Sequence, residues 1–260
     1  MTELHGQPVW FELATGDLAA AGRFYHRVIG WQIADSGMEG FAYHLASAEG
    51  GPVAGLMAMP GDAAGMAPAW TIYFGVNDAD RAAAAIRASG GTVLREPADI
   101  PGTGRFAICA DPQGVPFGIL CPDPMEDGAA ARAFDPQKAG HGHWAELASP
   151  DPDAAFGFYA GLFGWRKSTA MDMGEMGTYQ LFSHGSADIG AMMGLAAAGQ
   201  PRWLAYFGVN GIAAAAGRVR ESGGVIQHGP SPVPGDAHIL IATDPQGAWF
   251  ALVGPLEETP

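Results

Sequence analysis

Basic residues, cysteines and long apolar runs are all scarce in this chain of 260 residues. Only 13 lysines and arginines stand against 27 aspartates and glutamates, which gives a formal net charge of −14. Such a surface repels nucleic acid phosphates and anionic membrane surfaces, so we expect neither as a partner. No run approaches the roughly 18 apolar residues of a membrane helix, and the opening residues MTELHGQPVW do not resemble a signal peptide. We therefore expect a cytoplasmic protein.

The few cysteines and the many glycines form no recognisable motif. Cys109 and Cys121 each lie in an apolar, strand-like run, and we expect both to be reduced core residues. The 39 glycines include no GxxxxGK[ST] loop and no GxGxxG that follows a strand and opens a helix. The sequence therefore predicts no nucleotide site of either kind.

An internal repeat is the main positive feature of the sequence. Residues 9–31 match residues 143–165, and PAWTIYFGVN at 68–77 matches PRWLAYFGVN at 201–210. The turn DPQG occurs twice, beginning at Asp111 and Asp244, and its Asp, Pro and Gly favour a type I turn before a strand. Self-similarity of this kind indicates homologous domains. The predicted domains are residues 1–125 and 138–260. The predicted linker between them, residues 126–137, mixes Pro, Gly, Ala and charged residues.

Each domain is predicted to contain two copies of a shorter module, a strand, a helix and three strands. Asp17 can cap the first helix, which Gly30 would end. Apolar residues at helical spacing, the last of them Tyr25 and Val28, predict that one face of this helix packs against a sheet. In the second domain, Phe156, Tyr159 and Phe163 would form the same face. The expected elements of the first domain are strands at 9–14, 42–46, 53–59, 70–76, 105–110 and 115–120, short extended runs near Trp31 and Val93, and helices at 17–28 and 78–89.

The paired modules, the segment TGDLAAAGRFYHRVIGW and the closing DPQG turns resemble the vicinal oxygen chelate superfamily. That superfamily includes glyoxalase I, extradiol dioxygenases and bleomycin resistance proteins, and the resemblance covers nearly the whole chain. It implies an α+β fold of two tandem glyoxalase-like domains, each a pair of βαβββ modules that form a curved mixed sheet around a cleft. Four modules are enough for an internal pseudo-dimer, and a homodimer stays open.

The resemblance also implies where a metal ion would be bound. Metal-dependent members hold one divalent ion with three or four His, Glu or other oxygen ligands. In the first domain those positions fall on Trp10, Thr71, Gly118 and Gly55 or Met57. In the second domain they fall on Trp144, Leu204, Ala251 and Gly190 or Met192. We therefore predict no metal and no cofactor at the usual positions, and a divalent metal would need ligands elsewhere.

Alternation along the strands predicts what lines each cleft instead. Residues two apart share a face of a strand, so a cleft that receives Trp10 also receives Glu12, and the same holds for Trp144 and Glu146. Aromatic walls with a few polar groups are typical of small-molecule sites. The predicted ligand-binding residues are Trp10, Thr71, Tyr73, Trp144, Leu204 and Tyr206, and the predicted catalytic residues are Glu12 and Glu146.

The two glutamates and a histidine pair have alternative interpretations. Glu12 and Glu146 could have raised pKa values and act as general bases, could bind a cationic ligand, or could accept hydrogen bonds that only hold the fold together. His141 and His143 could both face one ion, but in an extended chain their side chains lie on the opposite face from that of Trp144. We expect these histidines outside the cleft and at the surface.

Two functions of different classes fit the sequence. The first is a binding protein whose metal-free clefts hold a small apolar or aromatic molecule. The alternative is an enzyme of the superfamily, a lyase, hydroxylase or dioxygenase, that uses a metal bound by residues elsewhere or uses Glu12 or Glu146 as a general base. The lack of metal ligands at the expected positions favours the first.

Overall fold

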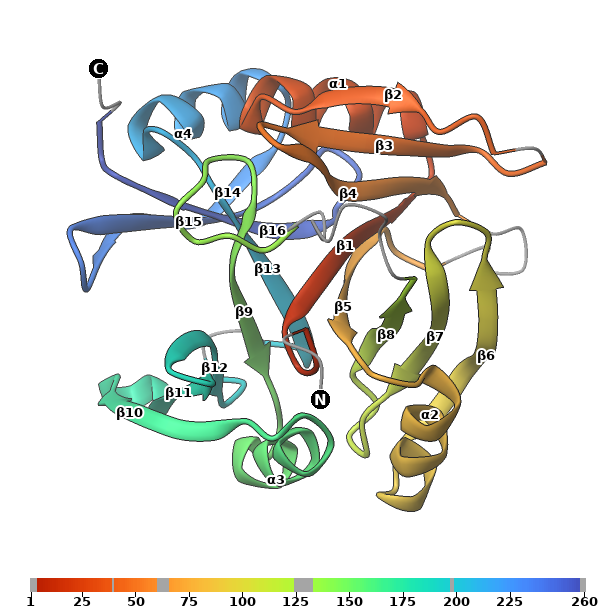
Figure 1. The fold of residues 1–260 in the computed structure, drawn as a ribbon. Coiled ribbons are helices and arrows are strands. Elements are labelled where there is room, and N and C mark those ends of the chain that lie inside the picture. The colour runs from red at the N-terminus through yellow and green to blue at the C-terminus, as the bar shows by residue number, and fades with distance from the viewer. Residues whose placement is uncertain (1–3, 39, 60–65, 124–132, 197–198, 258–260) are drawn as a thin grey trace. The chain divides into compact units, whose positions relative to one another are not determined.

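A computed structural model describes residues 4–38, 40–59, 66–123, 133–196 and 199–257. The chain contains the βαβββ module four times (Figure 1). The first module comprises β1 (Pro8–Thr15), α1 (Leu18–Ile29), β2 (Gln32–Asp35), β3 (Tyr43–Ala48) and β4 (Gly51–Ala58). The second comprises β5 (Ala69–Gly75), α2 (Ala79–Ala88), β6 (Thr92–Ile100), β7 (Gly104–Ala110) and β8 (Pro116–Pro122).

The second half of the chain repeats this order. The third module comprises β9 (Gly142–Ala148), α3 (Pro152–Phe163), β10 (Arg166–Asp172), the short 3-10 helix η2 (Gly174–Met176), β11 (Thr178–His184) and β12 (Ala187–Met193). The fourth comprises β13 (Arg202–Gly208), α4 (Ile212–Glu221), β14 (Val225–Val233), β15 (Ala237–Thr243) and β16 (Trp249–Gly254). Among the described residues, no helix is long and apolar enough to cross a bilayer.

The strands form two mixed sheets of eight, as far as the described residues extend. Their orders are β2-β3-β4-β1-β5-β8-β7-β6 and β10-β11-β12-β9-β13-β16-β15-β14. In each module the first strand runs parallel to the last, whereas the last three strands pair in antiparallel order. The predicted α+β fold with curved mixed sheets is therefore confirmed.

The helix boundaries follow from capping residues that the sequence displays. The Asp17 carboxylate accepts a hydrogen bond from the Ala20 amide at 2.9 Å, and α1 ends at Gly30, which has a φ of +94°. A positive φ strains other L-residues, so glycine suits this end of the helix. Asp151 and Gly164 begin and end α3 in the same way. The predicted start and end of the first helix are confirmed.

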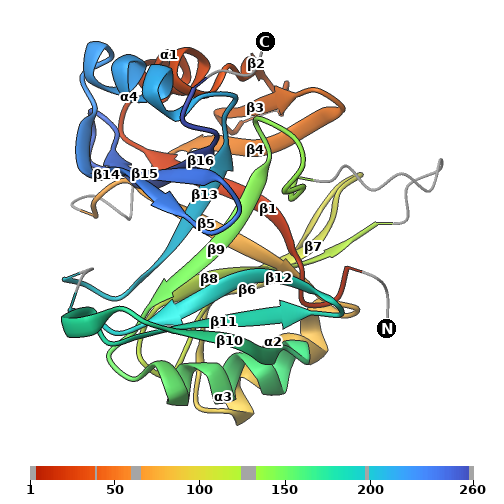
Figure 2. The same cartoon turned by 90° about the vertical axis from the view of Figure 1, so that its left-hand side faces the viewer.

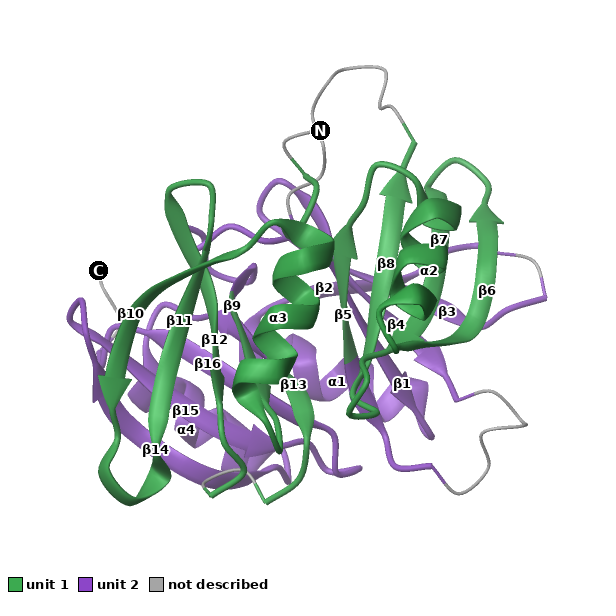
Figure 3. Cartoon of the chain, turned by 90° about the horizontal axis from the view of Figure 1, so that it is seen from below, with its two compact units in different colours: residues 1–9, 71–130, 144–204 green, residues 10–70, 131–143, 205–260 purple. Residues whose placement is uncertain are grey.

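The chain divides into two compact units, and each unit takes one half of each sequence repeat (Figure 3). One unit holds most of the second and third modules, in residues 1–9, 71–130 and 144–204. The other holds most of the first and fourth modules, in residues 10–70, 131–143 and 205–260. Helix α2 contacts α3 within the former, and α1 contacts α4 within the latter (Figure 2).

The predicted domains at 1–125 and 138–260 follow the sequence repeat and stay a prediction. Residues 126–132 of the predicted linker lie outside the described residues, and Phe134 beyond them forms a β-bridge with Gly142.

A buried tyrosine lies at the centre of the unit formed by the second and third modules. The Tyr159 hydroxyl accepts a hydrogen bond from Trp203 Nε1 at 3.0 Å and donates one to Asp111 Oδ2 at 3.1 Å. Its ring packs against the rings of Phe117, Phe158, Phe163, Trp165 and Trp203. The predicted aromatic face of α3 is therefore confirmed for Tyr159 and Phe163.

The prediction for Phe156 is wrong. Phe158 is buried in its place, while Phe156 is half-buried and its ring lies 5.2 Å from the Lys167 ammonium.

The first and fourth modules pack around a second tyrosine of the same kind. The Tyr25 hydroxyl accepts a hydrogen bond from Trp70 Nε1 at 2.9 Å and donates one to Asp244 Oδ2 at 3.2 Å. Because Tyr25 lies on α1 and Asp244 precedes β16, this chain of hydrogen bonds joins residues far apart in the sequence. Burial raises the pKa of Tyr25 well above its usual value, so the phenol stays protonated and donates to the carboxylate.

The repeated DPQG turns explain why these two aspartates are held in place. Asp111 Oδ1 accepts hydrogen bonds from the amides of Gln113 and Val115, both at 2.9 Å, and the Gly114 amide bonds to the Asp111 carbonyl at 2.9 Å. Asp244 accepts the corresponding bonds from Gln246 and Ala248. The predicted tight turn is confirmed, and its aspartate also accepts a hydrogen bond from the hydroxyl of a buried tyrosine.

Candidate functional site

Strand β1 presents two different faces, as its alternation predicts. Phe11, Leu13 and Thr15 are fully buried, whereas Trp10 and Glu12 between them are half-buried. Side chains two apart on a strand share a face, so the indole and the carboxylate lie on the same side of β1. In the partner strand β4, Gly55 lies beside Glu12 in parallel register.

A hydrogen-bonded cluster is built on this face of β1. Trp10 Nε1 donates to the Tyr43 hydroxyl at 3.0 Å, and that hydroxyl donates to Glu12 Oε2 at 3.0 Å. Tyr43 comes from β3, so the cluster joins residues of two strands of the same module. We call Trp10, Glu12 and Tyr43 the first cluster.

Burial and then the nearby Glu12 charge raise the pKa of Tyr43 well above its usual range. The phenol therefore stays protonated and is the donor in its hydrogen bond to the Glu12 carboxylate.

The second sequence repeat contains an equivalent cluster. Trp144 Nε1 donates to the Tyr179 hydroxyl at 2.9 Å, and this hydroxyl donates to Glu146 Oε2 at 2.8 Å. Burial and the Glu146 charge raise the pKa of Tyr179 as well. We call Trp144, Glu146 and Tyr179 the second cluster. Glu146 is only 8% exposed, so this cluster is the more enclosed of the two.

Tyr43 and Tyr179 are the residues that reasoning from β1 and β9 alone misses. Alternation identifies side chains within one strand, but it gives no register between strands. A signal was present, because the pattern YxLxS begins at Tyr43 and at Tyr179 in matching places of the two repeats. A repeated tyrosine at the start of the third strand of a module is what the clusters require.

The other predicted ligand-binding residues lie on β5 and β13. Tyr73 is 3% exposed, and its ring centroid lies 6.4 Å from that of Phe106. A Cβ at Gly118 would overlap the Tyr73 ring, so glycine is required beneath it. Thr71 is half-buried. Leu204 and Tyr206 are each 3% exposed, and Tyr206 pairs with Ala251 of β16.

The two histidines before Trp144 bind backbone carbonyls. His141 Nδ1 lies 3.2 Å from the Ala139 carbonyl and His143 Nε2 lies 2.8 Å from the Lys138 carbonyl. His141 is only 3% exposed, so the expected surface position is wrong for this residue. Burial lowers the pKa of His143, which favours its neutral form. Both rings fix the segment that leads into β9.

The residues at the expected ligand positions do not fit a divalent cation. The indoles of Trp10 and Trp144 are donors only, and neither Gly118 nor Ala251 offers a side-chain ligand. Across the described ranges, no three His, Cys, Asp or Glu side chains gather closely enough to hold a metal ion. Each cluster contributes one carboxylate, fewer than the three or four ligands that such a site needs.

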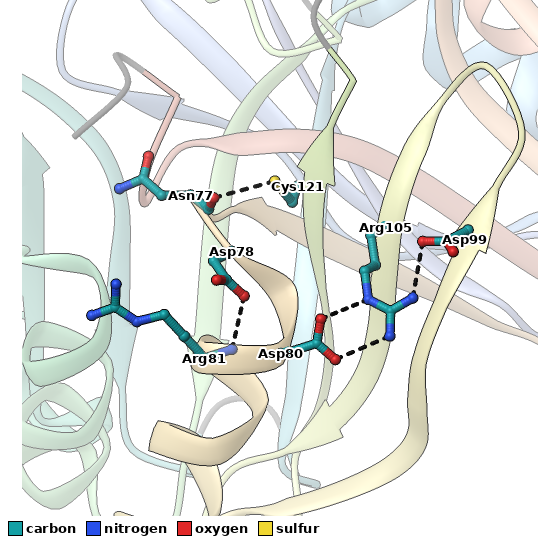
Figure 4. A network of polar contacts seen from close by, with 7 residues as sticks. All are labelled: Asn77, Asp78, Asp80, Arg81, Asp99, Arg105 and Cys121. Carbon is teal, nitrogen blue, oxygen red and sulfur yellow. Dashed lines mark hydrogen bonds and ion pairs between the residues drawn. The ribbon is translucent and has the colours of Figure 1, made fainter.

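A polar network near α2 contains two of the ion pairs formed by the described residues (Figure 4). Arg105 makes a two-point contact with Asp80, at 2.7 and 3.0 Å, and binds Asp99 at 2.9 Å. The guanidinium lowers the pKa of the Asp80 carboxyl. Both aspartates are well exposed, and Asp78 beside them caps α2. These contacts support the β6–β7 hairpin and the helix start, and we assign them no binding role.

Comparison with known proteins gives a match over both repeats. The family model described as Glyoxalase/Bleomycin resistance protein/Dioxygenase superfamily matches residues 7–119 and 141–252. A Mycobacterium tuberculosis protein named "Putative glyoxylase CFP32" is 31% identical over 254 residues, which cover 96% of this chain and 95% of that protein. The "Anthracycline biosynthesis protein DauV" of a Streptomyces species is 32% identical over 277 residues, covering 98% of this chain and 95% of that protein.

Solved structures share the fold at lower identity. The Mn(II)-bound glyoxalase from Novosphingobium aromaticivorans superposes with a TM-score of 0.65 at 19% identity, covering 98% of this chain and 83% of that one. An extradiol ring-cleaving dioxygenase from B. fuscum superposes with a TM-score of 0.68 at 19% identity, covering 100% and 75%. These likenesses concern the fold alone.

Proposed function

The chain belongs to the Glyoxalase/Bleomycin resistance protein/Dioxygenase superfamily, and from this premise we propose that it binds a flat aromatic molecule without a metal ion. The observation that carries the proposal is which side chains lie on β1 and β9. Each cluster offers aromatic rings and one carboxylate, where metal-dependent relatives would need several oxygen or imidazole ligands. Rings of this kind favour an aromatic ligand through stacking and edge-to-face contacts.

The names of the relatives support an aromatic ligand. One relative is named as an anthracycline biosynthesis protein, and it aligns with 98% of this chain. Anthracyclines are flat polycyclic aromatic compounds, and aromatic side chains are common in the sites that bind such molecules. An aromatic ligand of this class therefore agrees with both the side chains and the relative.

A second candidate function is acid–base catalysis by the clusters. It is favoured by the pairing in each cluster of a carboxylate with a protonated phenol, at 3.0 and 2.8 Å, because these are a base and an acid side by side. A relative named as a glyoxylase makes methylglyoxal with a thiol the substrate to try. Turnover that is lost in Glu12→Gln or Glu146→Gln would favour this candidate over pure binding.

Fluorescence titration tests the binding proposal. Titrating the anthracycline daunorubicin should quench tryptophan emission, because a stacked ligand lies beside the indoles of the clusters. The double variant Trp10→Phe with Trp144→Phe should show weaker quenching and weaker binding. Trp249→Phe, which removes an indole elsewhere, serves as the matched control and should retain the affinity.

Two results would contradict the proposal. One is wild-type protein that does not respond to daunorubicin or binds it no better than the non-aromatic cyclohexanol. The other is a double variant whose affinity equals that of the Trp249→Phe control.

A further inference from the structure

The two clusters differ at one position of the neighbouring strand. Gly55 lies beside Glu12 in the pairing of β4 with β1, and Ala191 lies beside Glu146 in the pairing of β12 with β9. The register is the same, so the two residues occupy equivalent places. The first cluster therefore has a glycine where the second has a methyl group.

The glycine decides how its tyrosine lies. A Cβ built on Gly55 would overlap the hydroxyl and the adjoining ring atoms of Tyr43, so the phenol rests directly over the bare backbone of β4. In the second cluster the methyl group of Ala191 prevents Tyr179 from lying equally close to the backbone of its neighbouring strand. Tyr179 still makes both of its cluster hydrogen bonds. The methyl group of Ala191 thus fills space that the first cluster leaves to its tyrosine.

The clusters also differ in how far they open to solvent. Glu146 is 8% exposed, whereas Glu12 is half-buried. Two residues before Tyr43 stands Phe41, which is 41% exposed and stacks on the Tyr43 ring with centroids 5.9 Å apart and planes 25° apart. The same position in the second repeat, two residues before Tyr179, is Gly177. An accessible aromatic ring therefore accompanies the first cluster at this position, and glycine accompanies the second.

We propose that the first cluster is the ligand site of the chain and that the second cluster is a structural copy. Phe41 supplies the accessible ring on which a flat aromatic ligand stacks. Because Gly55 has no side chain, Tyr43 lies close against β4 and leaves room for the ligand. The second cluster ties β9 to β11 without taking a ligand. This inference rests on the proposed function, because it assigns the aromatic ligand to one of the two clusters.

Calorimetric titration of daunorubicin into the full chain tests the assignment. We expect one ligand per chain. Phe41→Ala should weaken binding about tenfold through the lost ring contact, and Gly55→Ala should weaken it by a similar factor by displacing Tyr43. The matched controls lie in the second repeat, where Ala191→Gly and Met173→Ala, a change in the corresponding exposed hairpin, should leave the affinity unchanged.

The outcomes separate this inference from the proposed function. Two equal sites per chain, or an unchanged affinity in Phe41→Ala, would overturn the inference and leave aromatic binding intact. Wild-type protein that binds no daunorubicin would overturn the proposed function itself. Phe41 is exposed, so its variant should fold normally and decides the question even where Gly55→Ala alters the melting temperature.

Discussion

At the scale of residues, one hydrogen-bonded relay from tryptophan through tyrosine to a carboxylate occurs four times in the described part of the chain. Two relays, centred on Tyr25 and Tyr159, lie in the cores of the compact units. The other two, centred on Tyr43 and Tyr179, lie on the opposite face of the strands. The tyrosines of the two core copies are fully buried, so these hydrogen bonds by themselves do not mark a ligand site. Our assignment of the first cluster as the ligand site therefore rests on its exposure and on the neighbouring Gly55 rather than on the hydrogen bonds.

The two thiols give a prediction at the same scale. Cys109 is fully buried, and burial raises its pKa to about 12. Since only the thiolate reacts with alkylating reagents, Cys109 should resist iodoacetamide at mildly alkaline pH until the protein unfolds. The variant Cys121→Ser leaves this thiol alone, and mass spectrometry of native and unfolded samples reads its labelling. Complete labelling of Cys109 in the native protein would contradict the structure.

At the scale of elements, each DPQG turn holds the start of a helix in a different module. Gln113 Nε2 donates to the Asp151 carbonyl at 2.9 Å, and Gln113 Oε1 accepts hydrogen bonds at 2.8 Å from the Asp151 amide and the Ser149 hydroxyl. Gln246 makes the corresponding contacts with the amide and carbonyl of Asp17, at 2.7 and 2.9 Å. The glutamine of the turn thus links modules that lie in different repeats of the sequence.

Removing these glutamines should destabilise the protein. Gln113→Ala and Gln246→Ala each remove hydrogen bonds to exposed backbone groups at a helix start, at an expected cost of about 0.5–1.5 kcal/mol each. Because the two glutamines share no hydrogen-bond partner, the costs should add in the double variant. Gln137→Ala, at an exposed position, is the control. Denaturant unfolding that finds the three single variants equally stable would refute this role of the turn.

The elements themselves were largely predictable, because local signals specify them. Asp17 and Gly30 mark the ends of α1 in the sequence, and the structure places the cap and the left-handed residue there. Phe156 shows where local reasoning fails. Several apolar side chains of α3 fit a helical stripe, and only packing against the second module selects Phe158 over Phe156.

At the scale of the whole molecule, sequence similarity and compactness divide the chain differently. The repeat indicates domains at 1–125 and 138–260, because similarity compares residues one by one. The compact units instead combine residues 10–70 with 205–260, and 71–130 with 144–204, because buried aromatic rings such as Tyr25 and Phe250 join modules of different repeats. Such contacts depend on how modules pack, which periodicity along the chain does not encode.

The candidate site was predictable to the same limited extent. Alternation places Trp10 and Glu12 on one face, but Tyr43 comes from β3, and the sequence marks Gly55 only as one of two places where a metal ligand would fall. The register of β4 beside β1, and of β3 beside β4, brings these residues together. The sequence therefore predicts Trp10 and Glu12 together, whereas only strand pairing adds Tyr43 to them.

We propose above all that an aromatic ligand binds to this chain without help from a metal ion. Calorimetric titration of daunorubicin into wild-type protein, before and after exhaustive dialysis against a chelator, tests it most directly. We predict the same affinity and the same stoichiometry in both titrations. Binding that disappears after chelation and returns on addition of Mn²⁺ or Fe²⁺ would contradict the claim.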